Sequence, residues 1–426
     1  MNAFAYKNGA LHCEDVALAR IAAEVGTPVF VYSSGAILAR FRAYAAAFPD
    51  AHVCYALKAN SNLAILRLLA REGAGADVVS GGELELALAA GVPSDKIVFS
   101  GVGKSRAEIR RAIEAGIGQI NVESEAELGM LSETAAGLGK RVAVALRVNP
   151  DVDPKTHAKI TTGKKENKFG VAIDAAPGLY ARGSNLPGLR MVGFAVHIGS
   201  QLVDLAPYRS AFAALGRLTR DVRAQGLTVE RLDLGGGLGI VYRDEAPPSI
   251  EAYAEAARRE VGNLGCHLSL EPGRSLVGNA GALLASVILV KDGGKRFVVI
   301  DAAMNDLIRP TLYEAYHEIL PIEEPAPGAP RKAADVVGPI CETGDILASH
   351  RPLPDLREGS KVAILSAGAY GAVMASSYNA RPLAAEVLVK GGEFAVVRPR
   401  QSIEELIARD RVPDWLGGPP TSRNRA

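Results

Sequence analysis

The stretch VCYALKANSNLAILRLLAREGAGADVVSGGELELALAAG, residues 53–91, decides the fold because it contains two complete strand–helix units. Val53–Leu57 and Asp77–Ser80 are short β-rich runs. The Ala- and Leu-rich segments that follow them, Leu63–Ala70 and Glu83–Ala90, have a helical pattern. This alternation predicts parallel strands that are joined by crossover helices.

The alternation continues along the chain and predicts eight strands in total. The other six are Ile97–Ser100, Gln119–Val122, Val142–Val148, Val192–His197, Arg231–Leu234 and Leu268–Glu271. Eight parallel units in about 250 residues predict an α/β fold, a (β/α)8 TIM-type barrel over residues 27–280. A doubly wound open sheet is the alternative. We favour the barrel because polar or glycine residues follow almost every strand, and a barrel brings all eight strand ends to one face.

After residue 280 the pattern changes to β-rich runs without regular crossover helices. The predicted strands here are Val287–Val290, Arg296–Ile300, Lys361–Leu365 and Glu386–Val389. They predict an all-β second domain over residues 281–426, an antiparallel β-sandwich or barrel. The first 26 residues have a turn-punctuated β pattern, so we expect them to complete this domain rather than the barrel.

Composition and charge exclude several classes of protein. Because 48 Lys and Arg nearly balance 47 Asp and Glu, the net charge of +1 argues against a nucleic-acid partner. The longest apolar stretch, Ala280–Val290, is shorter than the ~20 residues that span a membrane, and the start of the chain has no secretory pattern. The four scattered cysteines form no C-x-x-C pair. We therefore expect reduced thiols, no metal site and a cytoplasmic protein.

Two strand ends carry residues that suit a nucleophile and a phosphate. Lys58 ends the first barrel strand, where burial can remove the charge of a lysine and make its amine reactive toward a carbonyl. A solvated surface lysine is the alternative. Gly235, Gly236 and Gly237 end the seventh strand and can turn backbone N–H groups toward a phosphate. A tight turn explains them equally well, and neither a dinucleotide fingerprint nor a Walker loop fits their spacing.

Two further strand ends carry charged or titratable residues. Glu271 and Arg274, in EPGR, follow the eighth strand and can address different parts of one ligand. A surface ion pair is the alternative. His197 ends the sixth strand, where a packed or hydrogen-bonded histidine is the alternative to a catalytic one. Its place on the shared face of the barrel favours a functional role.

Seven motifs together resemble those of the fold-type III pyridoxal-phosphate decarboxylases, and within them most closely the diaminopimelate decarboxylases. The motifs are YALKAN (55–60), DVVSGGEL (77–84), HIGSQ (197–201), GGG (235–237), EPGR (271–274), CETGD (341–345) and GAYGAVMASSYN (368–379). They occur in order through nearly the whole chain and are specific in combination. The resemblance implies pyridoxal 5'-phosphate as cofactor, and decarboxylation of meso-2,6-diaminopimelate to L-lysine and CO2 as the last step of lysine biosynthesis.

The resemblance also implies a role for each cofactor-site residue. Lys58 carries the cofactor covalently, His197 stacks on the pyridine ring, and Glu271 pairs with the ring nitrogen and keeps it protonated. A protonated ring is the better electron sink. The other implied cofactor-site positions are Ser200, Gly235, Gly236, Gly237, Pro272, Gly273, Arg274 and Tyr370.

For the substrate, the resemblance implies a site that grips the distal amino-acid end. The implied residues are Arg274, Arg309, Tyr313, Glu342 and Tyr370. Arginine suits a carboxylate because its planar fork binds both oxygens. Cys341 is implied to be the catalytic thiol, and Cys341 and Glu342 to be lent by a partner subunit, so the active unit should be a homodimer.

Glu342 helps to distinguish between the substrates of related decarboxylases. Ornithine decarboxylases have aspartate after this cysteine, so glutamate, together with Arg309 and Tyr313, favours a zwitterionic distal end. A plain turn before a strand is the alternative explanation of CETGD. Another basic amino-acid decarboxylase and a non-catalytic homologue are the competing functions. The polar segment Asp151–Lys168 is either a loop near the site or an exposed disordered loop.

Overall fold

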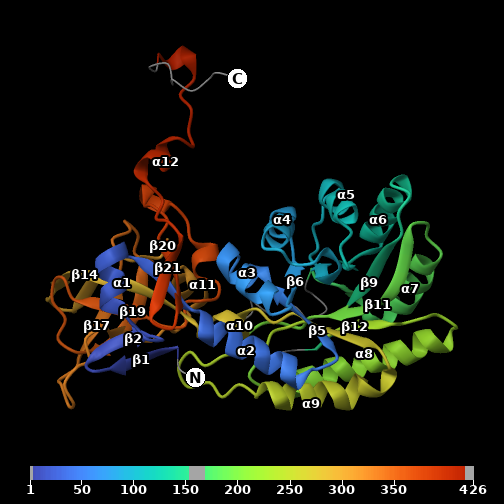
Figure 1. Cartoon of the computed structure of the whole chain (residues 1–426), viewed down its shortest axis with the longest axis horizontal. Helices are drawn as coiled ribbons and strands as arrows, with labels where there is room; N and C mark the ends of the chain where they lie inside the picture. Colours follow the sequence, from blue (N-terminus) through green and yellow to red (C-terminus); the bar gives the residue numbers. More distant parts are fainter. Residues whose placement is uncertain (1–2, 153–167, 418–426) are drawn as a thin grey trace.

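The computed structural model describes residues 3–152 and 168–417. The predicted loop at residues 151–168 therefore lies almost entirely outside the described residues. Along the long axis of the molecule, a barrel of strands and helices lies at one end and a mostly β domain at the other (Figure 1). The two predicted architectures are both present.

Eight parallel strands close into the predicted TIM-type barrel. Their order is β5-β6-β7-β8-β9-β11-β12-β13, and β13 pairs with β5 to complete the ring. The bounds are β5 (Ala51–Ala56), β6 (Gly75–Val78), β7 (Ile97–Phe99), β8 (Gln119–Val122), β9 (Val142–Asn149), β11 (Leu189–Val196), β12 (Arg231–Asp233) and β13 (His267–Leu270). A two-residue strand, β10 (Val171–Ala172), adds to β9. Each strand lies at or within a few residues of its predicted position.

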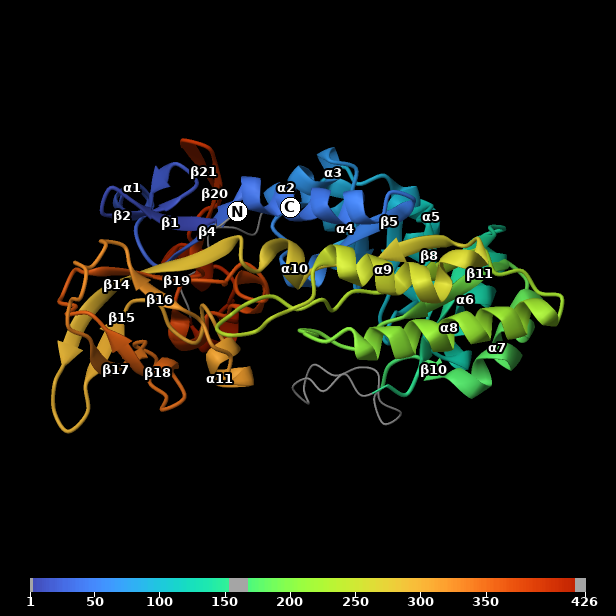
Figure 2. The same cartoon turned by 90° about the horizontal axis from the view of Figure 1, so that it is seen from below.

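Helices cover the outside of the barrel, and most of them begin at side-chain caps. They are α3 (Leu63–Arg71), α4 (Gly81–Ala89), α5 (Arg106–Ala115), α6 (Glu125–Gly137), α7 (Ala176–Ser184), α8 (Ala206–Ala224) and α9 (Ile250–Val261). Asn62, Ser80, Ser105 and Ser124 each accept a hydrogen bond from a backbone N–H in the first turn. Because Ser80 is the cap, α4 begins at Gly81, before the predicted start at Glu83. Figure 2 shows α8 and α9 side by side along one face of the barrel.

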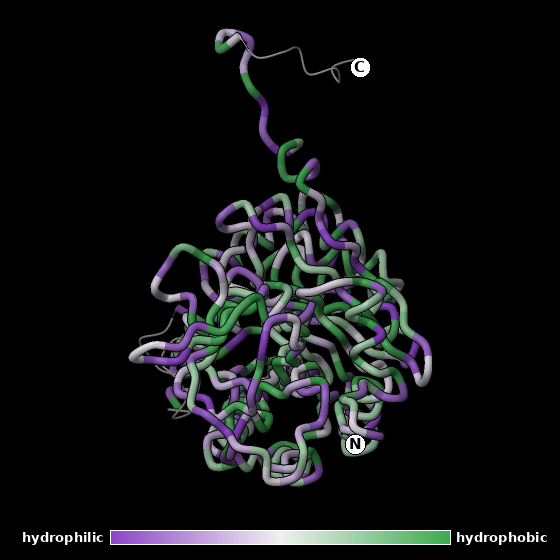
Figure 3. Tube along the Cα trace, turned by 90° about the vertical axis from the view of Figure 1, so that its left-hand side faces the viewer, coloured by the Kyte–Doolittle hydropathy of each residue, from purple (hydrophilic) through white to green (hydrophobic). Residues whose placement is uncertain are grey.

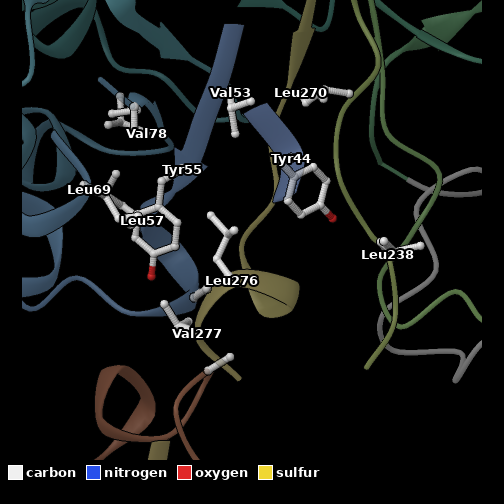
Figure 4. Packing of buried hydrophobic residues seen from close by; sticks show 14 of the residues in the cluster. Tyr44, Val53, Tyr55, Leu57, Leu69, Val78, Leu238, Leu270, Leu276 and Val277 are labelled. Atoms are coloured by element: carbon white, nitrogen blue, oxygen red, sulfur yellow. The ribbon is translucent and has the colours of Figure 1, made fainter. Parts of the chain in front are cut away.

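Large apolar and aromatic side chains fill the region where the barrel meets α2 (Ser34–Ala47) and α10 (Arg274–Val277) (Figure 4). Tyr44 of α2 and Tyr55 of β5 are buried, with exposed fractions of 1% each. Their hydroxyls nevertheless have partners, because Tyr44 Oη lies 2.8 Å from Ser275 Oγ and Tyr55 Oη donates to the carbonyl of Asn60 at 2.8 Å. Burial of the rings with satisfied hydroxyls holds the ends of β5 and β13 firmly in place.

The second domain is built on a nine-stranded mixed sheet. Its main path is β18-β17-β15-β14-β4-β20-β21, with β19 pairing β14 and β16. The bounds are β4 (Val29–Ser33), β14 (Gly281–Lys291), β15 (Phe297–Ile300), β16 (Ile319–Pro321), β17 (Lys332–Val337), β18 (Ile346–Leu353), β19 (Lys361–Ile364), β20 (Ala385–Lys390) and β21 (Glu393–Arg398). The sequence pattern predicts β14, β15, β19 and β20 but misses β4, β16, β17, β18 and β21. β18 carries three consecutive polar residues, 349–351, and Pro352 interrupts it, which is tolerated because β18 is an edge strand.

Two pairings in this sheet differ from the expected antiparallel arrangement. β4 pairs with β20, and β15 pairs with β17, in parallel. In addition, β4 lies between β14 and β20, although the boundary at residue 27 assigns Val29–Ser33 to the barrel. A β-rich run in a sequence identifies a strand but not its neighbours, so this correction needed the tertiary structure.

The N-terminal segment forms a small sheet of β1 (Phe4–Lys7), β2 (Ala10–Cys13) and β3 (Val16–Ala17), followed by α1 (Leu18–Val25). Its apolar side chains, including Leu11 and Ile21, share one buried cluster with Val31 and Leu284 of the large sheet. At the other end of the chain, the segment around α12 (Ile403–Ile407) projects away from the body (Figure 3). Within the described parts of the chain, no helix is long and apolar enough to cross a membrane.

Candidate active site

The carboxyl ends of the barrel strands bring a lysine and buried carboxylates together. Lys58 follows β5, and its Nζ donates to Asp77 Oδ2 at 2.6 Å. Asp77 lies in β6 and is fully buried. Burial lowers the pKa of Lys58, but the charges of Asp77 and Glu271 outweigh it and hold this pKa above its usual value. Lys58 is therefore an ammonium here, whereas burial alone would have favoured the neutral amine expected from the sequence.

Glu271 follows β13 and is buried beside a second carboxyl group, that of Asp233 in β12. Burial raises the pKa of Glu271 well above its usual range, and the charges of Asp233 and Asp77 raise it further. Ser100 Oγ donates to Glu271 Oε1 at 3.3 Å. Among three such neighbouring carboxyl groups, like-charge repulsion favours a shared proton.

A chain of hydrogen bonds ties these carboxyl groups to the barrel interior. Asn121 Nδ2 donates to Asp233 Oδ2 at 3.0 Å and to Ser100 Oγ at 3.1 Å. Asp233 Oδ1 accepts from the N–H of Gly235 at 2.9 Å. Because β7, β8, β12 and β13 each supply a member, the position of Glu271 is determined by the closed barrel rather than by one loop.

His197 ends β11 and contacts the glycine turn. The N–H of Gly236 donates to His197 Nδ1 at 3.2 Å, so Nδ1 is the unprotonated ring nitrogen. Burial lowers the pKa of His197 well below its usual value, and the nearby charges of Arg147 and Lys58 act in the same direction. The imidazole is therefore neutral.

The triple glycine is required by close packing of the strand ends. A Cβ on Gly235, Gly236 or Gly237 would lie 2.3, 2.2 and 2.2 Å from backbone oxygens of neighbouring strand ends. Gly235 and Gly237 also have φ values of 67° and 101°, which favour glycine. These contacts explain the three glycines without a ligand, so an approach to phosphate would be an additional role.

Two buried arginines lie at the same end of the barrel. Arg274 donates from Nη2 to Ser200 Oγ at 3.0 Å and from Nη1 to Tyr242 Oη at 2.6 Å. Its guanidinium lies 4.8 Å from the ring centre of Tyr370. Arg309 begins the short helix α11 (Arg309–Tyr313), and its guanidinium lies 4.6 Å from the ring of Tyr242. The ring of Tyr242 thus contacts the guanidinium groups of both Arg274 and Arg309, and either guanidinium can bind a carboxylate.

Cys341 and Glu342 lie elsewhere, on the exposed turn between β17 and β18. The N–H of Cys341 donates to Asn379 Oδ1 at 3.0 Å, and Tyr378 shares a hydrogen bond with Glu342. Within the described part of one chain, neither residue interacts with Lys58 or with the buried arginines. The structure brings the other predicted site residues to the barrel end but leaves these two outside it.

Comparison with known proteins now identifies the family. Residues 34–278 match the family described as "Pyridoxal-dependent decarboxylase, pyridoxal binding domain". The diaminopimelate decarboxylase of Zymomonas mobilis is 50% identical over 97% of this chain and 99% of its own length. The chain belongs to the diaminopimelate decarboxylases. That of Pseudomonas aeruginosa is 51% identical over 97% of this chain and 99% of the relative.

A solved diaminopimelate decarboxylase has the same fold. The enzyme from M. jannaschii, in co-complex with L-lysine, superposes with a TM-score of 0.93 at 39% identity, covering 97% of this chain and 99% of its own. As a member of this pyridoxal-dependent family, the chain uses pyridoxal 5'-phosphate. Its residues fit that group: a buried oxygen, Asp77 Oδ1, has no hydrogen-bond partner among the described residues, and the buried Glu271 carboxyl suits a cationic ring nitrogen.

Sequence reasoning on this diaminopimelate decarboxylase missed several residues of the site. Asp77 is the first residue of the quoted motif DVVSGGEL, and Asp233 interrupts the apolar run LDL. A carboxylate inside an apolar strand is a usable signal, because it will be buried and needs partners. Tyr242 and His317 carry no comparable signal, since the first lies in a loop and the second after a short helix.

Proposed function

We propose that this chain decarboxylates meso-2,6-diaminopimelate to L-lysine and CO2, as the last step of lysine biosynthesis. The observation that carries the proposal is one barrel end that holds Lys58 among buried carboxyl groups beside two buried arginines. The first group suits a pyridoxal cofactor, and the second suits a substrate whose far end retains a carboxylate.

The proposed cofactor contacts come from four strand ends of the barrel and from Tyr370, which follows β19 of the second domain. Lys58 Nζ would form the covalent link, Glu271 would pair with the ring nitrogen, and His197 would lie against the ring. The phosphate would lie near Ser200, Gly235, Gly236, Gly237, Pro272, Gly273, Arg274 and Tyr370. When bound, the cofactor supplies the electron sink for the departing carboxylate.

Proton positions follow from the charges around Lys58. Its amine must lose a proton before it can bond to carbon, and the Asp77 and Glu271 carboxylates oppose that loss. A cation at the ring position beside Glu271 would offset both carboxylates and so favour the neutral amine. The neutral imidazole of His197 adds no competing charge. The candidate donors of a proton to the carbon that loses CO2 are Lys58 Nζ and the thiol of Cys341.

The proposed substrate contacts address the distal end. Arg309 and Arg274 would bind the carboxylate that is retained in L-lysine, with Tyr313 and Tyr370 beside them. Glu342 would accept the distal ammonium. Its exposure and its separation from the barrel end within one chain support a homodimer, in which Cys341 and Glu342 of the partner subunit complete the site.

We also propose a cytoplasmic location. The four cysteines, all in described regions, are free thiols, which suits a reducing compartment.

A substrate panel tests the activity. Holoenzyme with added pyridoxal 5'-phosphate is assayed for CO2 release from meso-diaminopimelate, ornithine and arginine. We expect kcat/KM for meso-diaminopimelate to exceed the others by about 10⁴, since the latter leave Arg309 without a carboxylate. Failure on diaminopimelate with turnover of ornithine or arginine would assign another basic amino-acid decarboxylase. A protein that binds the cofactor but releases no CO2 from any of them would be a non-catalytic homologue.

A further inference from the structure

A buried histidine contacts the guanidinium of Arg309. Arg309 is 5% exposed, and its Nη1 lies 2.8 Å from Nε2 of His317. Arginine is only a hydrogen-bond donor, so His317 Nε2 accepts. Arg309 Nε is buried and has no hydrogen-bond partner among the described residues. The guanidinium is therefore hydrogen-bonded through Nη1, whereas its Nε is enclosed but unpaired.

His317 can accept because its other nitrogen is bound to the backbone. His317 is fully buried, and its Nδ1 lies 2.8 Å from the carbonyl oxygen of Leu365, which begins the turn after β19. A carbonyl only accepts, so Nδ1 carries the proton and Nε2 presents a lone pair. Burial, with a further contribution from the charge of Arg309, lowers the pKa of His317 to about 3. The acceptor is thus present at any pH at which the enzyme works.

Tyr242 restrains the same guanidinium from a second direction. Its ring lies 4.6 Å from Arg309 Cζ and meets the His317 ring edge-on, at 5.5 Å between centres and 81° between planes. Tyr242 is in turn held by Arg274 through its hydroxyl. With Nη1 bound to His317, the edge of the fork formed by Nε and Nη2 is left for a carboxylate, which that edge binds through two hydrogen bonds.

We infer that His317 is a positioning residue, which orients Arg309 so that its Nε/Nη2 edge meets the carboxylate at the distal end of the substrate. This inference rests on the proposed function, because it takes the distal carboxylate as the ligand of Arg309. His317 itself touches neither the substrate nor the cofactor. Its contribution is to select one of the orientations available to the Arg309 side chain. Because the His317 ring is neutral, it does this without adding a second charge beside the guanidinium.

Two substitutions separate the two hydrogen bonds of His317. In His317→Asn, the amide nitrogen takes the place of Nδ1 and keeps the bond to Leu365, but the acceptor for Arg309 is lost. In His317→Gln, the amide oxygen reaches the place of Nε2 and keeps the acceptor. Arg309→Ala is the reference for complete loss of the guanidinium.

The readout is competitive inhibition of the holoenzyme by two probes. L-lysine has the distal carboxylate, and cadaverine has the same carbon chain and both amines without it. For His317→Asn we expect the inhibition constant of L-lysine to rise about tenfold or more, as for a misdirected charged hydrogen bond, while that of cadaverine changes little. His317→Gln should recover most of the loss. In the double variant Arg309→Ala/His317→Asn, the inhibition constant of L-lysine should be no higher than in Arg309→Ala alone.

Equal weakening of both probes, or no change for either, would overturn the inference, because a merely structural histidine does not distinguish them. If both histidine variants unfold, the protonation state of His317 is measured instead, by ¹⁵N NMR of the wild-type holoenzyme with labelled histidine. A His317 ring protonated only at Nδ1 would support the inference. A ring protonated at Nε2 would overturn it. Failure of the proposed function looks different: wild-type holoenzyme would not turn over meso-diaminopimelate, and L-lysine would bind it no better than cadaverine does.

Discussion

The barrel end and the turn between β17 and β18 differ in how completely one chain builds them. At the barrel end, Lys58, Asp77 and Glu271 are held by hydrogen bonds and charge pairs that come from several strands. On the β17–β18 turn, Cys341 and Glu342 are exposed, and within the described residues they hydrogen-bond to Asn379 and Tyr378 of their own domain. One chain thus buries the first group of residues among its own partners and leaves the second group at its surface.

This difference supports the proposed division of labour between two copies of the chain. In the proposal, the barrel end would supply the cofactor contacts, whose charges need mutual neutralisation in a buried site. The exposed turn would supply a thiol and a carboxylate to the site of a second copy.

The largest effect is expected from mixing two inactive variants. Lys58→Ala and Cys341→Ala should each lose activity by about 10³-fold or more, because each removes a group that acts in the reaction. In a randomly exchanged mixture, half of the dimers are hybrids with one intact site, so about a quarter of wild-type activity should return. Decarboxylation of meso-diaminopimelate is measured before and after mixing.

Subunit exchange is verified with a tagged pair, and mixing Lys58→Ala with tagged Lys58→Ala is the control that should stay inactive. If exchange is complete and activity stays at zero, both groups act within one chain, and the comparison drawn above is wrong.

A smaller loss is expected for Glu271→Gln. The amide keeps the size and the hydrogen bond to Ser100 but cannot pair as an anion with the ring nitrogen. We expect kcat to fall by about 10²- to 10³-fold while the cofactor remains bound, as seen from its absorbance. Ser100→Ala is the matched control, since it removes only the donor to Glu271 and should cost less. A kcat equal to that of the wild type would refute the proposed role.

The smallest effect concerns Asp77→Asn and the charge of Lys58. Without the Asp77 charge, burial counts for more and the pKa of Lys58 falls, so its neutral amine is present at lower pH. Cofactor incorporation into the cofactor-free protein, followed by absorbance, should therefore have its pH dependence shifted to lower pH.

The stability of the cofactor-free Asp77→Asn protein should change in a matching way. Because Lys58 has a raised pKa in the folded state, its pair with Asp77 stabilises the wild type below the unfolded pKa of about 10.4. That contribution is lost as pH rises through the folded pKa, so the difference in thermal midpoint between wild type and variant should shrink at high pH. An unshifted incorporation profile would contradict the role of Asp77.

Much of the barrel is readable from the sequence because its information is local. Strand–helix periodicity and caps such as Asn62 and Ser105 depend on neighbouring residues, so they survive without tertiary contacts. The β domain is less readable. Its strand β4 comes from residues 29–33 and inserts between β14 and β20, and no local pattern specifies that pairing.

At the site, local sequence information gives the residue types, whereas their charges and orientations depend on tertiary contacts. The sequence by itself determined the eight strand–helix units, the residues at the strand ends and the motifs that indicate a pyridoxal-phosphate decarboxylase. Only the tertiary structure decided that Lys58 is charged, that His197 and His317 are neutral, and that Arg309 has an unpaired Nε. Charge and orientation depend on burial and on partners distant in the chain, such as Asp77 for Lys58 and Leu365 for His317, and folding alone brings these together.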